Sequence, residues 1–151
     1  MADIALFYNQ GTNRFDWDIS SGDIAVAGVL SGTSDLETAV ILSLFCDRLA
    51  NPDYVLPKNV TDRRGWWGDV YEPTPSGSNL WQLKYIPKTN NILQIAVKMC
   101  NDALQWMITD GVAASVVTTA NWYAPNRTDI LVLNITITEP VTLKQYKFKY
   151  S

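Results

Sequence analysis

The chain has 151 residues, of which 47% are hydrophobic and 18% are charged, and its net charge is −3. This length is typical of one domain with its own core, and the negative charge argues against a general nucleic-acid binder, which needs a basic surface to neutralise phosphates. Histidine is absent, so the commonest general base and the commonest metal ligand play no part here.

The apolar runs, the N-terminus and the cysteines do not indicate a membrane helix, a secretory signal or a metal site. No apolar run approaches the roughly 18–20 residues that a membrane helix needs. The N-terminus has no basic region ahead of a long apolar segment, which does not fit a secretory signal, so we expect folding in a cytoplasm. Cys46 and Cys100 lie in apolar helical patterns without metal-type spacing, and we expect small buried hydrophobes. We expect no metal, cofactor, membrane or small-molecule substrate.

The first thirty residues predict β structure. Residues 4–8 and 15–19 are strand-like and flank a polar turn that contains Gly11. The second of them alternates apolar and acidic residues, which is typical of a hairpin with one face in water. Residues 24–30 form a further apolar, strand-like segment.

A first helix is predicted from Ser34. Ser34 and Glu37 have the spacing of a capping box, in which each side chain binds the backbone amide of the other residue. The apolar residues that follow fall on one face of a helix: Leu36, Val40, Ile41, Leu44 and Phe45. We expect Asn51 and Pro52 to end the helix.

Residues 51–77 interrupt the regular pattern with prolines, glycines and charges. They contain the sequence DRRGWWGD at residues 62–69, here called the double-tryptophan loop. A long irregular connection in a small domain usually carries function or binds a partner. Residues 78–83 then resume apolar spacing and predict a short helix that Pro87 ends.

The strongest helical pattern covers residues 91–110. Apolar residues occupy about half of its circumference, so this helix is expected to lie in the core. Asn91 and Gln94 resemble a second capping box, and Asp110 with Gly111 supplies a left-handed C-terminal stop.

After Gly111 the apolar period changes from 3.6 to 2. Residues 112–122, 131–137 and 146–150 alternate apolar and polar side chains, with Val112 and Ala114 expected to face inward in the first strand. We therefore predict an α+β fold: an N-terminal hairpin and two or three helices packed on a C-terminal three-stranded antiparallel meander. The single domain, residues 1–151, divides into a β segment (1–30), a helical part (34–110, with the irregular loop 51–77) and the meander (112–150).

Three interpretations of the double-tryptophan loop remain open. Asp62 and Asp69 could be paired carboxylates of a glycoside hydrolase, but Arg63 and Arg64 favour ionised carboxylates, whereas the catalytic acid must be protonated. The tryptophans, with Trp81, could instead stack on sugars or anchor a protein partner. Alternatively, the arginines tie the loop to carboxylates or backbone carbonyls while the indoles fill a gap in the core.

The order and spacing of several segments resemble a known family. These are LETAVILSLF at 36–45, the double-tryptophan loop, GSNLWQL at 77–83, ALQWM at 103–107 and DGVA at 110–113. Together they are similar to the Mu-like phage gene-46 product family of baseplate wedge proteins, which is related to the small lysozyme-like wedge protein of T4-type baseplates. The resemblance spans roughly residues 23–150.

The resemblance implies a non-enzymatic part of the baseplate wedge of a contractile tail, located in the virion tail and assembled in the host cytoplasm. The implied partners are the larger baseplate J-like wedge protein and the tail sheath and tube or hub proteins. The Glu-Pro-Arg clamp of T4-type relatives is missing, since Glu139-Pro140 is followed by Val141. The residues expected at the protein interface or in its structural loop are Asp62, Arg63, Arg64, Gly65, Trp66, Trp67, Gly68, Asp69, Ser78, Leu80 and Trp81.

The last predicted strand forms a second candidate interface. Its lysines are typical of a sheet edge that charge protects from unwanted pairing. An open edge can also accept a strand from a neighbouring subunit. The residues expected at this edge are Lys144, Tyr146, Lys147, Phe148, Lys149 and Tyr150.

Overall fold

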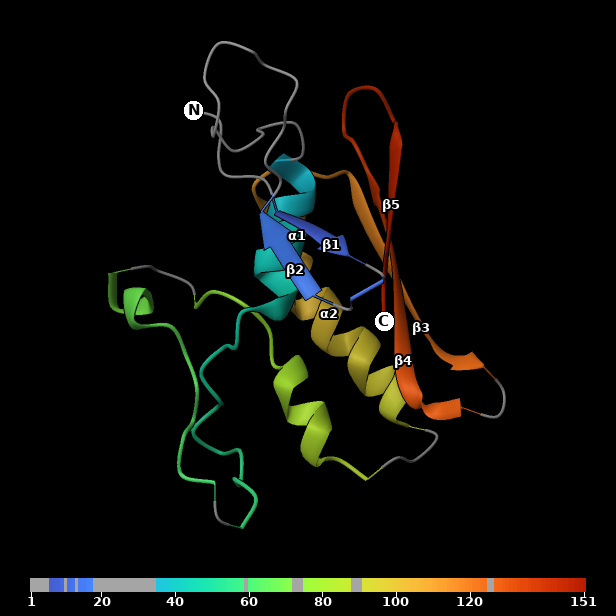
Figure 1. The fold of residues 1–151 in the computed structure, drawn as a ribbon. Coiled ribbons are helices and arrows are strands. Elements are labelled where there is room, and N and C mark those ends of the chain that lie inside the picture. Colours follow the sequence, from blue (N-terminus) through green and yellow to red (C-terminus); the bar gives the residue numbers. More distant parts are fainter. Residues whose placement is uncertain are drawn as a thin grey trace.

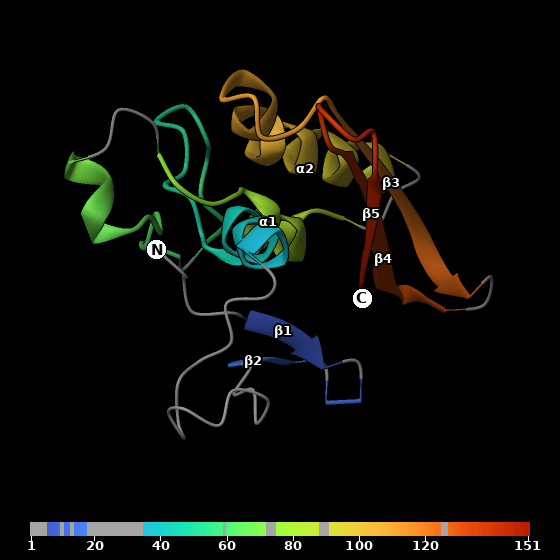
Figure 2. The ribbon, with the colours of Figure 1, turned by 90° about the horizontal axis from the view of Figure 1, so that it is seen from above.

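A computed structural model describes residues 6–9, 11–12, 14–17, 35–58, 60–71, 75–87, 91–124 and 127–151. A β-hairpin, a group of helices and a three-stranded sheet follow one another along the chain (Figure 1). The predicted α+β fold is confirmed. In two perpendicular views the helices lie between the sheet on one side and the irregular loop on the other (Figures 1 and 2). No helix within these ranges has the length and apolar character to cross a membrane.

The N-terminal hairpin forms as predicted. Strand β1 (Leu6–Asn9) pairs antiparallel with β2 (Arg14–Trp17), with Leu6 opposite Trp17. The hairpin contacts α1 through β1. The apolar segment 24–30 and Ser34, the first residue of the predicted capping box, lie outside the described residues.

Helix α1 (Asp35–Phe45) ends well before the predicted stop at Asn51. After Phe45 the chain forms backbone hydrogen bonds with a distant segment: the Ser78 amide donates to the Cys46 carbonyl and the Arg48 amide donates to the Ser78 carbonyl, both at 2.9 Å. The Ser78 hydroxyl also donates to the Leu44 carbonyl. Tertiary hydrogen bonds thus replace the next helical turn, which the sequence pattern alone does not reveal.

Helix α2 (Ile92–Thr109) is the core helix, as predicted. Its inward face is almost fully excluded from solvent at Ala96, Cys100, Leu104 and Met107. The predicted capping box at Asn91 is wrong, because the backbone of Asn91, just before the helix, already has the right-handed helical conformation and its side chain makes no capping hydrogen bond. The left-handed stop is confirmed by Gly111, whose φ is +72°.

Two short 3₁₀ helices lie between α1 and α2. The first, η1 (Trp67–Tyr71), begins inside the double-tryptophan loop. The second, η2 (Leu80–Tyr85), is the short helix predicted after residue 78, and it packs on both α1 and α2. Its half-buried leucines, Leu80 and Leu83, extend the apolar core beyond the two long helices.

The meander consists of β3 (Ser115–Ala124), β4 (Arg127–Thr138) and β5 (Gln145–Tyr150), with β4 in the centre. The inward faces align in register: Ile135 is opposite Thr118 and Phe148, and Leu133 is opposite Ala120 and Tyr150. The apolar side chains among them pack against the helices in one core. The opposite face carries polar and lysine side chains together with the exposed Val117 and Tyr123, and helix α2 packs on the sheet through β3, so helices cover one face.

The start of the first meander strand differs from the prediction. The strand begins at Ser115, and the expected inward residues Val112 and Ala114 are exposed, Val112 by 43%, whereas Ala113 is buried. The Ala113 amide donates to the Met107 carbonyl at 2.9 Å. The turn after α2 therefore sets which side chains face inward, and alternation applies only from Ser115 onward.

Candidate protein interface

The double-tryptophan loop packs against the residues that follow α1. The Ala50 amide donates to the Arg63 carbonyl at 2.9 Å, and the Gly65 amide donates to the Asp47 carbonyl at 3.2 Å. Residues 46–50 therefore form two backbone hydrogen bonds with Ser78 and two more with this loop. The two candidate segments, 62–69 and 78–81, are brought together by a stretch that the sequence pattern assigned to helix.

Arg63 turns into the loop and satisfies backbone carbonyls. Its Nη2 donates to the carbonyl oxygens of Pro52 at 2.7 Å and Tyr54 at 3.2 Å, and its Nη1 donates to the Tyr54 carbonyl at 3.3 Å. A planar guanidinium can serve several acceptors in this way, which a lysine cannot. Arg63 thus ties the turn at 51–54 to the loop, as the structural interpretation expected.

Arg64 fixes the turn before the tryptophans. It has a left-handed backbone, with φ of +61°, and its amide donates to Oδ1 of Asp62 at 2.8 Å. Its guanidinium forms an ion pair with Asp47 at 3.1 Å and lies 5.7 Å from the centre of the Trp81 ring. Gly65 follows with φ of +100°, and a side chain there would touch Leu49.

Trp81 is a half-buried packing residue. Its indole Nε1 donates to the Arg48 carbonyl at 3.0 Å, and its ring meets the edges or faces of Tyr54 and Tyr85 at centroid distances of 6.1 and 6.3 Å. Its candidate neighbours are also internal: Ser78 is buried and Leu80 packs on the core. These three candidate residues therefore take part in internal packing and hydrogen bonding.

Trp66 and Trp67 point outward. Their exposed fractions are 49% and 77%, and their ring centres lie 5.3 Å apart with the ring planes tilted by 48°. Trp66 lies over Gly68, where an added Cβ would come within 2.3 Å of the ring. The indoles therefore do not fill a gap in the core, and the tilted pair does not form one coplanar platform on which successive sugar rings would stack.

The structure adds two residues to this surface. In η1, Val70 and Tyr71 follow Trp67 by three and four positions, and their exposed fractions are 84% and 82%. In a 3₁₀ helix residues three apart share one face, so Val70 lies on the same face as Trp67, and Tyr71 is the exposed residue next to Val70. Predicting a helical turn from Trp67 would have identified Val70 and Tyr71 as surface residues, but the flanking glycines and prolines do not indicate a helix. We call Trp66, Trp67, Val70 and Tyr71 the tryptophan face.

Asp69 anchors this face to the domain. Its Oδ1 accepts the Ser76 amide at 2.9 Å, and its own amide donates to the Trp66 carbonyl at 3.1 Å. Its other oxygen, Oδ2, is buried and has no hydrogen-bond partner in the described part of the chain. Arg48 binds the residue next to Ser76, since its Nη2 donates to the Pro75 carbonyl at 2.7 Å.

The ionisable groups near the loop serve packing and hydrogen bonding. Within the described ranges, no cluster of three metal-ligating side chains occurs. Burial raises the pKa of the Cys46 thiol, helped by the negative charges of Asp47 and Asp69, and burial raises the pKa of Cys100 to about 12. Both thiols are therefore protonated at neutral pH, which does not suit a nucleophile.

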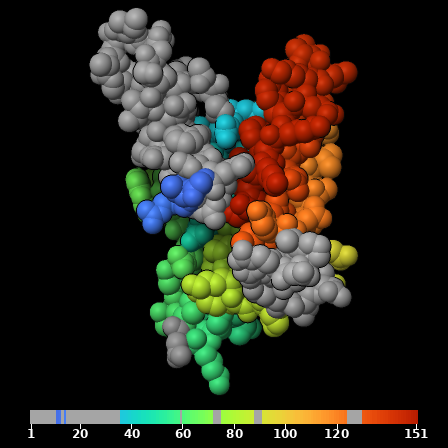
Figure 3. Space-filling model, turned by 45° about the vertical axis from the view of Figure 1, so that its right-hand side comes forward, coloured from blue at the N-terminus to red at the C-terminus, as the bar shows by residue number. Residues whose placement is uncertain are grey.

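The second candidate interface is the edge strand β5. Its side chains alternate: Lys147 and Lys149 are exposed, Tyr146 and Phe148 are half-buried, and Tyr150 is buried. Lys144, in the preceding turn, lies 4.8 Å from the centre of the Tyr146 ring. Within the described residues, β5 pairs with β4 alone. Figure 3 shows β5 and the β4–β5 turn projecting along one flank of the molecule.

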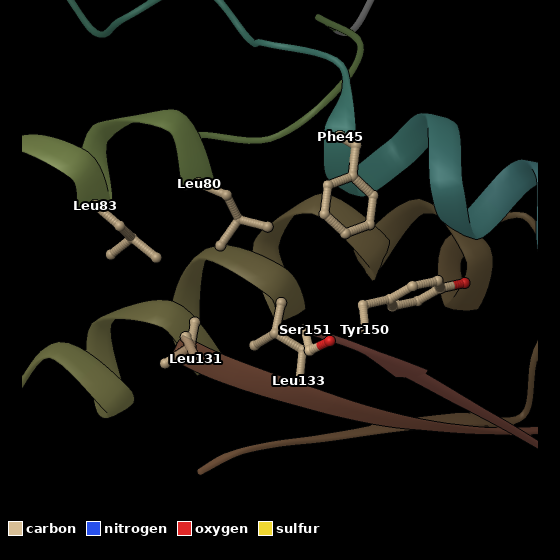
Figure 4. Close-up of a pocket in the computed structure, with 7 residues that line it drawn as sticks. All are labelled: Phe45, Leu80, Leu83, Leu131, Leu133, Tyr150 and Ser151. Atoms are coloured by element: carbon tan, nitrogen blue, oxygen red, sulfur yellow. The ribbon is translucent and has the colours of Figure 1, made fainter. Parts of the chain in front are cut away.

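An apolar cavity of about 160 Å³ lies at the C-terminal end of β5. Figure 4 shows its lining side chains converging from α1, η2, β4 and β5. It is lined by Phe45, Leu80, Leu83, Leu131, Leu133, Tyr150 and Ser151. The rings of Phe45 and Tyr150 meet edge to face at 5.3 Å, so the cavity continues the domain core at the strand end.

Comparison with known proteins gives a consistent result. Residues 36–144 match a family described as Phage protein GP46. The chain is 42% identical to the baseplate protein gp46 of Escherichia phage Mu over 101 residues, which is 66% of this chain and 70% of that protein. It is 37% identical to the Mu-like prophage FluMu protein gp46 of Haemophilus influenzae over 119 residues, 77% of this chain and 73% of that protein. The matched segment includes both the double-tryptophan loop and η2.

Proposed function

This chain belongs to the phage protein GP46 family, and from that premise we propose that it is a structural, non-enzymatic component of the baseplate wedge of a contractile phage tail. The observation that carries this proposal is the similarity to the Mu baseplate protein over two thirds of the chain. In this role the protein assembles in the host cytoplasm, helps to seat the tube and sheath, and remains in the tail baseplate of the virion.

The larger J-like wedge protein binds to the tryptophan face in this proposal. Four large apolar side chains stand exposed there on a loop that is fixed by Arg63, Arg64 and Asp69. Contiguous exposed aromatic surface is typical of protein interfaces, and tryptophan and tyrosine are frequent energetic anchors. A fixed loop also loses little conformational entropy when it binds.

Co-purification with the larger wedge protein tests this interface. The variant Trp67→Ala/Tyr71→Ala removes two anchors and leaves Arg63 in place to hold the loop. We expect at least a roughly tenfold loss of complex, because anchor residues each contribute about 2 kcal/mol or more. The control is Val117→Ala/Tyr123→Ala, which removes exposed apolar groups from β3. A folded Trp67/Tyr71 variant that retains full complex yield would rule out this face.

The edge of β5 accepts a strand from the sheath or a neighbouring subunit in the same proposal. The open edge of the meander supports it. Deleting β5 would remove the buried Tyr150, so single proline substitutions give a sharper test. Along an edge strand, the backbone amides of adjacent residues point to opposite sides. Of the two variants Lys147→Pro and Phe148→Pro, one therefore removes an amide that points toward the open edge. The other removes an amide that points toward β4 and breaks the β4 pairing.

We expect the better-folded proline variant to lose co-sedimentation with assembled sheath, while the wild-type chain is retained. Circular dichroism identifies the folded variant before the sheath experiment. Normal co-sedimentation of that variant would show that the sheath does not pair with this edge.

Glycan binding through Trp66, Trp67 and Trp81 is the alternative function. The 48° tilt of the Trp66 and Trp67 rings and the half-buried position of Trp81 do not favour it. Titration calorimetry with soluble peptidoglycan fragments separates the two functions. Saturable heat that disappears in Trp67→Ala would favour the glycan-binding module, and its absence agrees with the wedge role.

A further inference from the structure

The two faces of β5 carry different chemistry. Lys147 and Lys149 lie on the outward face of the sheet, whereas Tyr146, Phe148 and Tyr150 lie on the face that packs toward the helices. A strand that pairs with this edge would continue both faces, because directly opposed residues of neighbouring strands share a face. Its alternate side chains would therefore meet lysines on one side and aromatic rings on the other.

The two lysines have no acidic partner within the part of the chain that the structure describes. In the β4 register, Lys147 is opposite Thr136 and Lys149 is opposite Asn134, both of which are neutral. Neither lysine takes part in the ion pairs found among the described residues, which involve Arg64 and Lys98. Both lysines therefore place unneutralised positive charge on the outward face of the sheet, although the chain as a whole has a net charge of −3.

Lysines on an edge strand repel most incoming strands, because an apolar or basic strand would leave the ammonium groups desolvated or opposed by like charge. An acidic strand would instead form opposite-charge cross-strand pairs. The same two side chains can therefore exclude unspecific partners and admit one kind of segment.

We propose that the β5 edge selects an extended partner segment in which acidic residues alternate with apolar residues. The acidic residues pair with Lys147 and Lys149 on the outward face. The apolar residues lie beside Tyr146 and Phe148 on the inward face, and the apolar cavity lies at the end of the same row, beside Tyr150 (Figure 4). This inference rests on the proposed strand acceptance and names the chemistry of the accepted strand.

Synthetic peptides test the selectivity on the intact, ¹⁵N-labelled chain by NMR titration. The test peptide has ten residues, with glutamate at alternate positions, threonine between them and leucine at the two terminal apolar positions, so that either strand direction brings a leucine near Tyr150. A control peptide replaces every glutamate by lysine. We expect saturable amide shifts along residues 144–151 with the acidic peptide and about tenfold weaker binding of the lysine peptide.

A variant with reversed charge completes the test. Lys147→Glu/Lys149→Glu is expected to reverse the preference and bind the lysine peptide more tightly. The matched control Lys84→Glu/Lys98→Glu makes the same change in net charge on η2 and α2 and is expected to keep the preference for acid. A well-dispersed spectrum establishes that each variant is folded.

The outcomes separate this inference from the function on which it rests. Equal binding of both peptides along β5 would overturn acid selectivity while strand acceptance survives. Absence of shifts on β5 with either peptide would overturn both. If the Lys84/Lys98 control variant no longer preferred the acidic peptide, the preference would come from the net charge of the chain. That result would also overturn the proposed selectivity of the β5 edge.

Discussion

At the scale of single residues, the two adjacent arginines of the double-tryptophan loop have different roles. Arg63 donates hydrogen bonds to backbone carbonyls in the turn at 51–54, whereas Arg64 forms a half-exposed ion pair with Asp47. Hydrogen bonds from a charged group to partly buried carbonyls contribute more to stability than a solvent-exposed ion pair. The loop therefore depends chiefly on Arg63.

Replacing each arginine by lysine tests this difference. Arg63→Lys keeps the charge but loses the forked donor geometry, and we expect the free energy of unfolding to fall by about 1–2 kcal/mol. Arg64→Lys, the matched control, is expected to change it by less than about 0.5 kcal/mol. Urea denaturation followed by far-ultraviolet circular dichroism measures both. Equal effects would show that Arg63 is no more important than its neighbour.

Cys100 couples the stability of the domain to alkaline pH. Burial raises the pKa of its thiol from 9.0 to about 12 in the folded chain. Between these two values the unfolded chain gives up its proton while the folded chain keeps it, so stability is fully present below pH 9 and falls as the pH rises toward 12. Cys46, with a pKa raised in the same direction, adds to the fall.

We expect the free energy of unfolding to decrease by roughly 1 kcal/mol between pH 8 and pH 10 because of Cys100 alone. Cys100→Ala lowers stability at both pH values through the cavity it leaves, but it should remove this part of the pH dependence. Urea denaturation of both proteins at the two pH values checks the difference. An unchanged pH dependence in Cys100→Ala would contradict the assignment to this thiol.

At the scale of elements, the end of α1 is held by a segment far along the chain. Ser78, which lies 34 residues after Leu44, donates its hydroxyl to the Leu44 carbonyl, and its amide binds the Cys46 carbonyl. Gly77 permits this approach, because its φ is +83° and a Cβ there would come within 2.2 Å of the Cys46 carbonyl oxygen. The same contacts bring η2 against α1 and position the double-tryptophan loop.

Two glycines with similar backbones separate the cost of the clash from the cost of the conformation. Gly111→Ala has φ of +72° and open space around the new Cβ, so we expect a loss of about 1 kcal/mol. Gly77→Ala adds the clash with Cys46, and we expect a loss of about 3 kcal/mol or more. Thermal and urea unfolding measure both variants. Similar losses would mean that the α1–η2 junction yields easily to the added methyl group.

At the scale of the whole molecule, α1, α2 and the meander share one core. Side chains from all three elements, such as Leu44, Leu104 and Ile135, belong to a single buried cluster. The loop that carries the tryptophan face extends on the side of the helices away from the sheet (Figure 2). The two proposed interfaces, the tryptophan face and the β5 edge, thus lie on different parts of the molecule.

A shared core predicts cooperative unfolding. We expect the far-ultraviolet and near-ultraviolet circular dichroism signals to lose native structure at the same urea concentration. Leu104→Ala should destabilise the whole domain by about 2–5 kcal/mol, whereas the exposed neighbour Gln105→Ala should change stability by less than about 0.5 kcal/mol. Two separated transitions would show instead that the helical part and the meander are independent units.

The sequence by itself determined the α+β class, the N-terminal hairpin, the core position of α2, the meander and the family. These features depend on local periodicity and on short motifs: the 3.6-residue period of α2 buries Cys100 and Leu104, and the two-residue period of β4 buries Ile135 and Ile137. Such patterns survive folding because one face of each element must leave water.

Only the tertiary structure decided where α1 ends, which strand residues open the meander and which loop residues face outward. Hydrogen bonds from Ser78 stop α1, and a bond from Ala113 to Met107 sets the start of β3. Trp81 and Trp67 are the same residue type in neighbouring segments, yet Trp81 bonds to the Arg48 carbonyl while Trp67 stays exposed. The end of α1 and the burial of Trp81 depend on partners more than thirty residues away, which no local pattern encodes, whereas the start of β3 depends on the geometry of the turn that follows α2.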